Sequence, residues 1–171
     1  DTAEKFIYME YFIIEEGKFW NSILDILKRK AAEGVEVKVL YDDIGCMMTL
    51  PGDYHKTLKA YGIEATPFSR LKGNADSEFN NRSHRKITVI DGKIGYTGGV
   101  NIADEYINII QPYGYWKDTG VKLQGEAIKS LLLMFLQLYD VQGKQDEDFY
   151  KYIQDVKPVK SQGFVCPYGD G

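Results

Sequence analysis

The first third of the chain alternates a strand pattern, a helix pattern and a second strand pattern, and this order restricts the fold most. Residues 6–14, FIYMEYFII, are rich in aromatic and β-branched residues and predict a buried strand. Residues 20–27 carry apolar side chains at helical spacing, and Gly34 follows as a C-terminal cap. In residues 35–43, valines alternate with charged residues, as in a half-buried strand. Such a unit normally crosses over right-handed and pairs its strands in parallel.

The remaining segments extend this pattern. Residues 51–62 predict a second, shorter helix, and residues 63–68 predict a further strand. Residues 115–125 predict another strand, and apolar side chains in 128–139 recur at i, i+3 and i+4, as on a helix packed against a core. The polar residues 69–83 predict a long surface loop. We therefore expect one compact domain of the α/β class.

Composition narrows the class of protein further. A chain of 171 residues with 44% hydrophobic content can form one hydrophobic core. A chain of this length buries about 70% of the surface that its extended form exposes, so it can fold without disulfides or metal. Cys46 and Cys166 lack metal-ligand spacing, so we expect reduced cysteines and no zinc site. The net charge of -4 argues against nucleic acid as a partner but allows a local basic pocket. The longest apolar run, residues 130–139, is much shorter than the about 20 residues that span a bilayer, so the chain as given is expected to be soluble.

Polar groups and glycines concentrate in residues 84–101, HRKITVIDGKIGYTGGVN. The Asp-Gly pair at Asp91 lies between two apolar runs and predicts a tight hairpin. On the first strand of this hairpin, His84 and Lys86 should point the same way, about 6.6 Å apart, with Arg85 on the other face. That spacing lets the imidazole and the ammonium contact one phosphate group.

Three further residues could converge on the same anion. Gly98 and Gly99 allow close backbone approach, and the amide of Asn101 adds a donor. A free histidine has a pKa of about 6.5, so His84 is suited either to attack phosphorus as a neutral imidazole or to protonate a leaving alkoxide. No set of metal ligands accompanies it, and we expect neither a metal nor another cofactor.

The spacing His84-x-Lys86, then Asp91 after four residues, then Gly98-Gly99-x-Asn101, resembles the H-x-K-(x)4-D signature of the phospholipase D superfamily. Residues 80–106 and 113–125 are most similar to the first, N-terminal catalytic half of a bacterial cardiolipin synthase, and the resemblance covers nearly the whole chain. It implies a phospholipase D-like fold, a mixed β-sheet flanked by helices.

The resemblance also implies a metal-independent phosphodiester transfer through a covalent phosphohistidine. In the family, two motifs face each other: one histidine attacks phosphorus, the other protonates the departing alcohol, and lysines and asparagines hold the phosphoryl oxygens. This chain has one motif, because His55 lacks the spaced lysine, aspartate and glycines. We expect residues 1–157 to form one catalytic half and residues 158–171 to be a tail or the start of a linker to a second half.

Two carboxylates and a glycine complete the predicted site. Asp91 occupies the hairpin turn, where it should support strand geometry more than contact substrate. By resemblance, Asp118 stands where the family keeps a carboxylate hydrogen-bonded to the histidine, which would fix its tautomer; the alternative is a solvated strand charge. Gly99 replaces the serine or threonine often found in the wider superfamily, and a glycine there is common among cardiolipin synthases.

These features rank three functions. The leading hypothesis is phosphatidyl transfer: one phosphatidylglycerol forms phosphatidyl-histidine with loss of glycerol, and the hydroxyl of a second resolves it to cardiolipin. Its expected partners are the phospholipid, the second half of the same full-length chain and the membrane surface, with the catalytic domain on the cytoplasmic side of the cell membrane. The alternative is a single-motif phosphodiesterase or nuclease that acts as a homodimer. A third possibility is a non-catalytic interaction domain, against which the intact residue set argues. The sequence leaves the lipid acceptor open.

Overall fold

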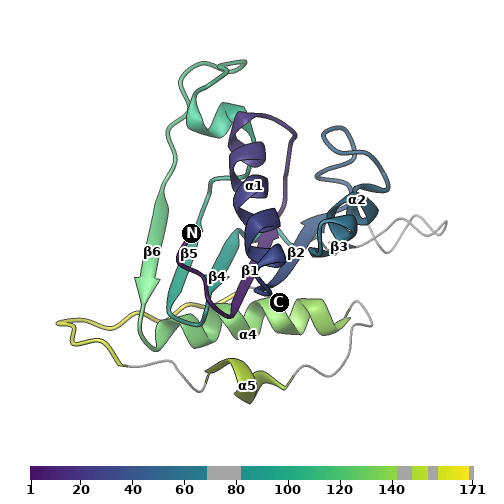
Figure 1. Cartoon of the computed structure of the whole chain (residues 1–171). Coiled ribbons are helices and arrows are strands. Elements are labelled where there is room, and N and C mark those ends of the chain that lie inside the picture. Colours follow the sequence, from purple (N-terminus) through teal and green to yellow (C-terminus); the bar gives the residue numbers. More distant parts are fainter. Residues whose placement is uncertain (69–81, 142–147, 154–157, 170–171) are drawn as a thin grey trace.

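A mixed β-sheet forms the centre of the computed structural model, which describes residues 1–68, 82–141, 148–153 and 158–169 (Figure 1). Within these residues the sheet has six strands in the order β3-β2-β1-β4-β5-β6. The strands are β1 (Phe6–Tyr11), β2 (Glu36–Asp42), β3 (Glu64–Phe68), β4 (Ile87–Ile90), β5 (Ile94–Gly98) and β6 (Gly120–Gln124). The α/β class and the mixed sheet predicted from the sequence are confirmed.

The two halves of the sheet differ in strand direction. β1, β2 and β3 are parallel, whereas β4, β5 and β6 are joined by antiparallel pairing, and β4 runs antiparallel to β1. The predicted hairpin joins β4 and β5: Asp91 and Gly92 have φ angles of 53° and 63°, and the Lys93 N–H donates to the Ile90 carbonyl at 2.9 Å. Two successive positive φ angles match the twist of the flanking strands, which explains the Asp-Gly pair.

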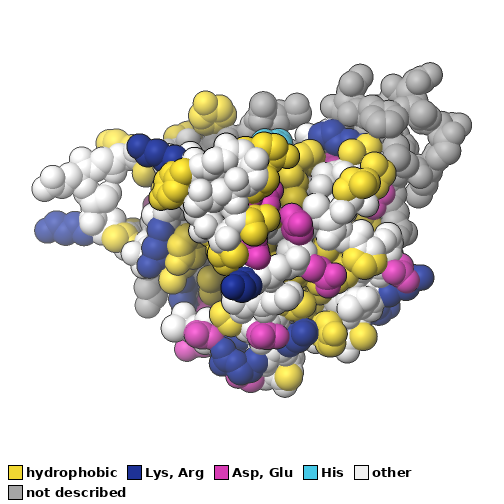
Figure 2. Space-filling view, turned by 90° about the horizontal axis from the view of Figure 1, so that it is seen from above, with side chains coloured by type: hydrophobic (Ala, Val, Ile, Leu, Met, Phe, Trp, Pro, Cys, Tyr) yellow, Lys and Arg dark blue, Asp and Glu magenta, His cyan; other side chains and the backbone are white. Residues whose placement is uncertain are grey.

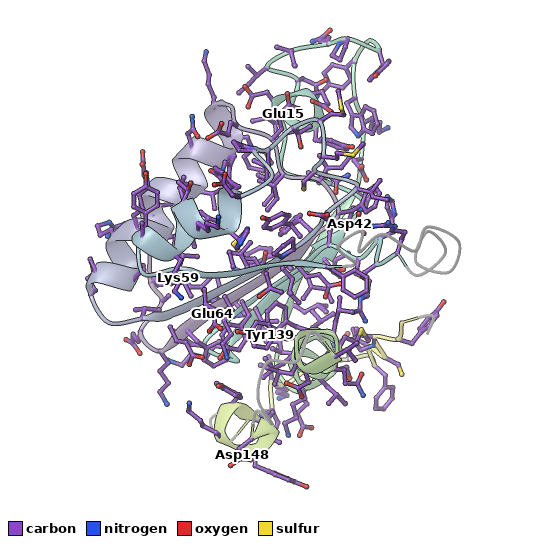
Figure 3. All side chains as sticks on the ribbon, turned by 90° about the vertical axis from the view of Figure 1, so that its right-hand side faces the viewer. Glu15, Asp42, Lys59, Glu64, Tyr139 and Asp148 are labelled. Atoms are coloured by element: carbon purple, nitrogen blue, oxygen red, sulfur yellow. The ribbon has the colours of Figure 1, made fainter. Side chains whose placement is uncertain are left out.

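Helices cover both faces of the sheet, so that the domain has three layers (Figure 3). The helices are α1 (Lys18–Ala32), α2 (Tyr54–Ala60), α4 (Ala127–Val141), α5 (Phe149–Ile153) and the short 3-10 helix η1 (Asp104–Ile107). One core cluster joins α1 and α2 to one face of β1 and β2, and a second joins α4 to the other face. No helix of the described ranges is long and apolar enough to cross a membrane.

The predicted half-burial of residues 35–43 is wrong. β2 lies between β1 and β3 with helices on both sides, so both of its faces are buried. Even Lys38 is only 2% exposed; its ammonium lies 2.9 Å from Glu36 and 4.7 Å from the centre of the Tyr139 ring. Charge alternation in a strand therefore did not mark a solvent-facing side here.

Several predicted boundaries shift by a few residues. The first predicted strand ends at Tyr11, and Ile14 forms only an isolated bridge with Ile102. Cys46 is buried and Cys166 is exposed, and both are free, as expected. Most of the predicted surface loop, residues 69–81, lies outside the described residues, as does the proposed domain boundary at residue 157.

Candidate active site

His84 and Lys86 lie just before β4 and not on it, which corrects the sequence prediction. The pairing of β1 with β4 stops at Glu10 and Ile87, so β4 begins at Ile87. The two side chains nevertheless meet on one side of the chain, because both contact Phe12. The His84 ring packs edge-on against the Phe12 ring at 4.8 Å between centroids, and the Lys86 ammonium lies 5.6 Å from the centre of that ring.

Lys86 is buried and holds the backbone at His84 through a hydrogen bond. Its side chain is 3% exposed, and its ammonium donates a hydrogen bond of 2.7 Å to the His84 carbonyl. Burial lowers the pKa of Lys86 to about 8, and the negative charge of Asp118 opposes this shift. The group is therefore a cation at neutral pH, held at a defined place and only weakly solvated.

His84 is exposed, in contrast to Lys86. Its pKa is lowered, first by partial loss of water around the ring and second by the Lys86 cation, while Asp42 acts in the opposite direction. At neutral pH the neutral ring is therefore favoured, which is the form that can attack phosphorus.

Two buried carboxylates hold the segment around His84 in place through hydrogen bonds to its neighbours. Glu10, 3% exposed, accepts hydrogen bonds from Ser83 Oγ at 2.5 Å and Arg85 Nε at 2.9 Å. Asp42, 2% exposed, accepts one from Arg82 Nη1 at 3.1 Å. Figure 3 places Asp42 at the end of the sheet opposite Glu64, the first residue of β3. As predicted, Arg85 faces away from Lys86; it also reaches a backbone carbonyl of α4 at 3.4 Å.

These two ion pairs were not predicted from the sequence. The available signal was a glutamate inside an otherwise apolar strand, since a buried carboxylate normally needs a partner. Arginines on both sides of His84 supplied the candidates. Burial raises the pKa of Glu10, and Arg85 and Ser83 act against this rise.

Asp91 connects the hairpin turn to the start of β1. Its buried carboxylate accepts hydrogen bonds from the backbone N–H groups of Glu4, Lys5 and Phe6 at 2.9, 2.8 and 2.9 Å. The Asp91 N–H in turn donates to the Phe6 carbonyl at 3.0 Å. These contacts are structural, and they place β4 beside β1.

Gly98 and Gly99 bring two backbone segments together near Lys86. Gly98 has a φ of +155°, and a side chain there would collide with the Thr119 carbonyl. A side chain at Gly99 would collide with the Asp118 carboxylate. The absence of a β-carbon at both positions therefore allows the approach of residues 118–120.

Asp118 does not make the expected hydrogen bond to His84 in the described part of the chain. It is exposed, and its carboxylate accepts from the Trp116 indole N–H at 3.2 Å and from the Thr119 N–H at 2.7 Å. The Trp116 ring is in turn packed against Tyr106 at 4.7 Å. The carboxylate acts on Lys86 through its charge alone.

Asn101 is buried and already engaged within the protein. Its Oδ1 accepts from the Ile13 N–H at 3.0 Å, and its Nδ2 donates to the Tyr106 hydroxyl at 2.9 Å. The amide thus links the segment after β1 to η1. Both amide atoms of Asn101 therefore have partners within the protein, and its predicted contact with substrate stays a prediction.

A cavity of about 330 Å³ opens beside Lys86. It extends over the strands β5 and β6, and its lining comprises Tyr11, Lys86, Tyr96, Thr97, Gly98, Val100, Gly120, Val121 and Lys122. Within the described ranges, no group of three or more histidine, cysteine, aspartate or glutamate side chains gathers as a set of metal ligands.

The sequence matches a family model as well as a motif. The model of the cardiolipin synthase, phospholipase D-like domain matches residues 1–113, a range that includes His84, Lys86 and Asp91. The chain belongs to this family. The phospholipase D-like domain therefore has both the sequence and the sheet expected from the motif.

Two of the relatives described below are named cardiolipin synthases. The phospholipase D-like domain is 49% identical over 169 residues to an uncharacterized protein of Streptococcus mutans serotype c, covering 98% of this chain and 36% of that protein. It is 38% identical over 156 residues to cardiolipin synthase 2 of Staphylococcus epidermidis, covering 90% and 32%. It is 36% identical over 157 residues to the cardiolipin synthase of Oceanobacillus iheyensis, covering 90% and 33%. The chain thus spans about a third of the length of these relatives.

Solved structures share the fold at low sequence identity. Nuc, a phospholipase D family member from Salmonella typhimurium, superposes with a TM-score of 0.55 at 16% identity, covering 82% of this chain and 81% of Nuc. The phosphatidylserine synthase of Haemophilus influenzae superposes with a TM-score of 0.62 at 20% identity, covering 90% and 39%. The predicted phospholipase D-like fold is confirmed.

Proposed function

We propose that the phospholipase D-like domain is one catalytic half of a cardiolipin synthase-type phosphatidyltransferase, with a second motif outside this chain. The observation that carries the proposal is the pairing of His84 with Lys86, which itself lines a cavity, in a chain whose family is that of cardiolipin synthases. The substrate is phosphatidylglycerol, and glycerol leaves.

The reaction has two displacements at phosphorus. In the first, a neutral histidine forms a P–N bond while the P–O bond to glycerol breaks, and the second histidine protonates the glycerol oxygen. In the second, the hydroxyl oxygen of another phosphatidylglycerol forms a bond to phosphorus while the P–N bond breaks, and the histidine that protonated glycerol accepts the hydroxyl proton. Lys86 stabilises the negative charge on the phosphoryl oxygens in both steps. Either histidine of the pair can be the nucleophile.

The electrostatics of the domain support this assignment. The lowered pKa of His84 favours the neutral ring at neutral pH, and Lys86 supplies a cation with few competing partners. A weakly solvated cation interacts more strongly with a developing anion than a fully hydrated one. Neither group depends on a metal ion for its part, and we propose that the reaction needs no cofactor.

Exposed apolar side chains near the site support contact with a lipid surface. They lie in the loop after β2, at the end of η1 and in the loop that follows η1, and comprise Met47, Met48, Ile107, Ile109, Ile110, Tyr113 and Tyr115. Seen from above, the molecule carries hydrophobic side chains interspersed with acidic and basic ones (Figure 2). We propose that the full-length protein works at the cytoplasmic side of the cell membrane, where these loops would meet the bilayer.

The test uses the full-length chain with phosphatidylglycerol in detergent, and measures glycerol and cardiolipin. His84→Ala should abolish both products, whereas His55→Ala, a matched change on α2, should leave both rates close to those of the unchanged protein. Turnover should also persist in EDTA. Full cardiolipin formation by His84→Ala would refute the proposal. Cleavage of nucleic acid by a dimer of the present chain would favour the single-motif phosphodiesterase instead.

A further inference from the structure

The cavity beside Lys86 has a floor without side chains. Gly98 of β5 pairs with Gly120 of β6, and both line the cavity. Lys86 precedes Ile87, which pairs with Thr97, so Lys86 lies beside Gly98 in the same row across the sheet. The facing glycines therefore leave a strip of the cavity surface without side chains. This strip, the lane, begins at Lys86 and crosses the strands β5 and β6.

A second cation stands at the far end of this lane. Lys122 lines the cavity and pairs with Tyr96. This pair lies two residues along the strands from the glycine pair, and therefore on the same face of the sheet. Two strand spacings across and two residues along place the Cα atoms of Lys86 and Lys122 about 12 Å apart. Both side chains are long enough to direct their ammonium groups into the intervening space.

Among the described residues, the lining has two cations and no carboxylate. Apart from the lysines and glycines, the described lining residues are tyrosine, threonine and valine. Lys122 is exposed, and no ion pair to it occurs within the part of the chain that the structure describes. A volume of about 330 Å³ is at the lower end of the range for small-ligand sites. These properties suit a small polar group with negative charge at two positions.

We infer that this cavity is the subsite for the acceptor lipid, in which Lys122 binds the phosphodiester of the second phosphatidylglycerol while its glycerol group lies over Gly98 and Gly120. This inference rests on the proposed function. The terminal hydroxyl then points to the phosphoryl group held at Lys86. Its oxygen forms the new P–O bond as the P–N bond to histidine breaks, and its proton passes to the histidine that protonated glycerol in the first displacement.

The assignment gives Lys122 a role in choosing the acceptor. Free glycerol and water have no phosphate for Lys122 to bind, and the donor phosphate is held at Lys86. Loss of the Lys122 charge should therefore affect transfer to phosphatidylglycerol and spare the exchange of free glycerol into phosphatidylglycerol.

Two substitutions in the full-length chain test this. Lys122→Gln removes the cation at an exposed position, and Gly120→Val fills the lane, because no atom lies within 4 Å of a β-carbon built at Gly120. The matched controls are Lys56→Gln on α2 and Gly52→Val, where a β-carbon also meets nothing within 4 Å. Cardiolipin formation and the incorporation of labelled glycerol into phosphatidylglycerol are measured for each variant.

We expect Lys122→Gln to slow cardiolipin formation by about 10- to 100-fold, as for a lost charge-assisted hydrogen bond, with glycerol incorporation changed by less than about twofold. Lys122→Arg should restore most of the rate, and Gly120→Val should slow cardiolipin formation whereas both controls should not. Equal losses in the two reactions, or unchanged cardiolipin formation in both Lys122→Gln and Gly120→Val, would overturn the inference alone. An unchanged full-length protein that neither releases nor incorporates glycerol would refute the proposed function itself.

Discussion

At the scale of single residues, Phe12 determines the environment of the candidate nucleophile. Its ring touches the His84 ring and lies under the Lys86 ammonium, so it removes water from both. Loss of water is the first cause of the lowered pKa of His84. The proposed mechanism requires a neutral nucleophile, and a lower pKa keeps His84 neutral to a lower pH.

We predict that Phe12→Ala raises the pKa of His84 toward its ordinary value, because water can then reach the ring. If His84 is the nucleophile, the acidic limb of the pH profile of kcat/KM should move to higher pH in the full-length enzyme. NMR titration of the His84 ring measures the pKa directly. Phe164→Ala is the control, since Phe164 is fully exposed. An imidazole pKa that stays the same in Phe12→Ala would contradict the prediction.

Lys86 should set an upper limit on the working pH. Its pKa is lowered to about 8, so the side chain is charged below that pH and loses its proton above it. Because the cation stabilises the phosphoryl oxygens, activity should fall as the pH rises through this value. Lys86→Arg keeps the charge at high pH and should move the basic limb upward, whatever its effect on the maximal rate. A basic limb at the same pH in both proteins would assign that limb to another group.

At the scale of secondary structure elements, Asp91 fastens the β4–β5 hairpin to β1. Asp91→Ala leaves three backbone N–H groups near the start of β1 without their acceptor. Each such loss costs about 1 kcal/mol or more, so we predict a decrease of about 2–4 kcal/mol in the free energy of unfolding. Urea unfolding of this chain, followed by circular dichroism, measures it. Asp53→Ala on the surface is the control, and a loss of less than about 0.5 kcal/mol in Asp91→Ala would contradict the prediction.

Elements set by local sequence were predicted well, and those set by distant contacts were not. The crossover of residues 6–43 and the Asp-Gly hairpin follow from hydrophobic spacing and turn chemistry within a few residues. The start of β4 depends on where β1 ends, so His84 was wrongly placed on a strand. Sequence spacing also gave no sign that Trp116 and the Thr119 N–H would take the Asp118 carboxylate away from His84.

Candidate site residues show the same division. The motif positions His84 and Lys86 were predicted to act together, and the structure brings them onto one side of Phe12. The supports of this pair come from distant residues: the hydrogen bond between Glu10 and Ser83 spans 73 positions, and that between Asp42 and Arg82 spans 40. No periodic pattern links residues so distant in sequence, and a single chain without its relatives offers only the buried charge as a signal.

At the scale of the whole molecule, one motif provides one imidazole, whereas the proposed reaction has two roles for a histidine. A neutral nitrogen must attack phosphorus while a protonated group releases glycerol, and a single ring cannot be both at once. In this chain the other histidine is His55 on α2, a helix that packs beside β3, at the edge of the sheet away from β4. In the proposed reaction, His84 would therefore need a partner from outside these 171 residues.

We therefore predict that the present chain folds but does not release glycerol from phosphatidylglycerol at a significant rate. Water replaces a missing general acid poorly, and such an acid contributes about 10²- to 10⁴-fold to the rate. Half of the cations around the phosphoryl group would be absent as well. A homodimer could supply a second His84, but only if two copies of this face align their rings across a two-fold axis. Glycerol release in detergent, together with the molar mass by light scattering, tests the prediction: the full-length protein should be active and the present chain silent. Rapid turnover by a dimer of the present chain would show instead that two identical faces complete the site.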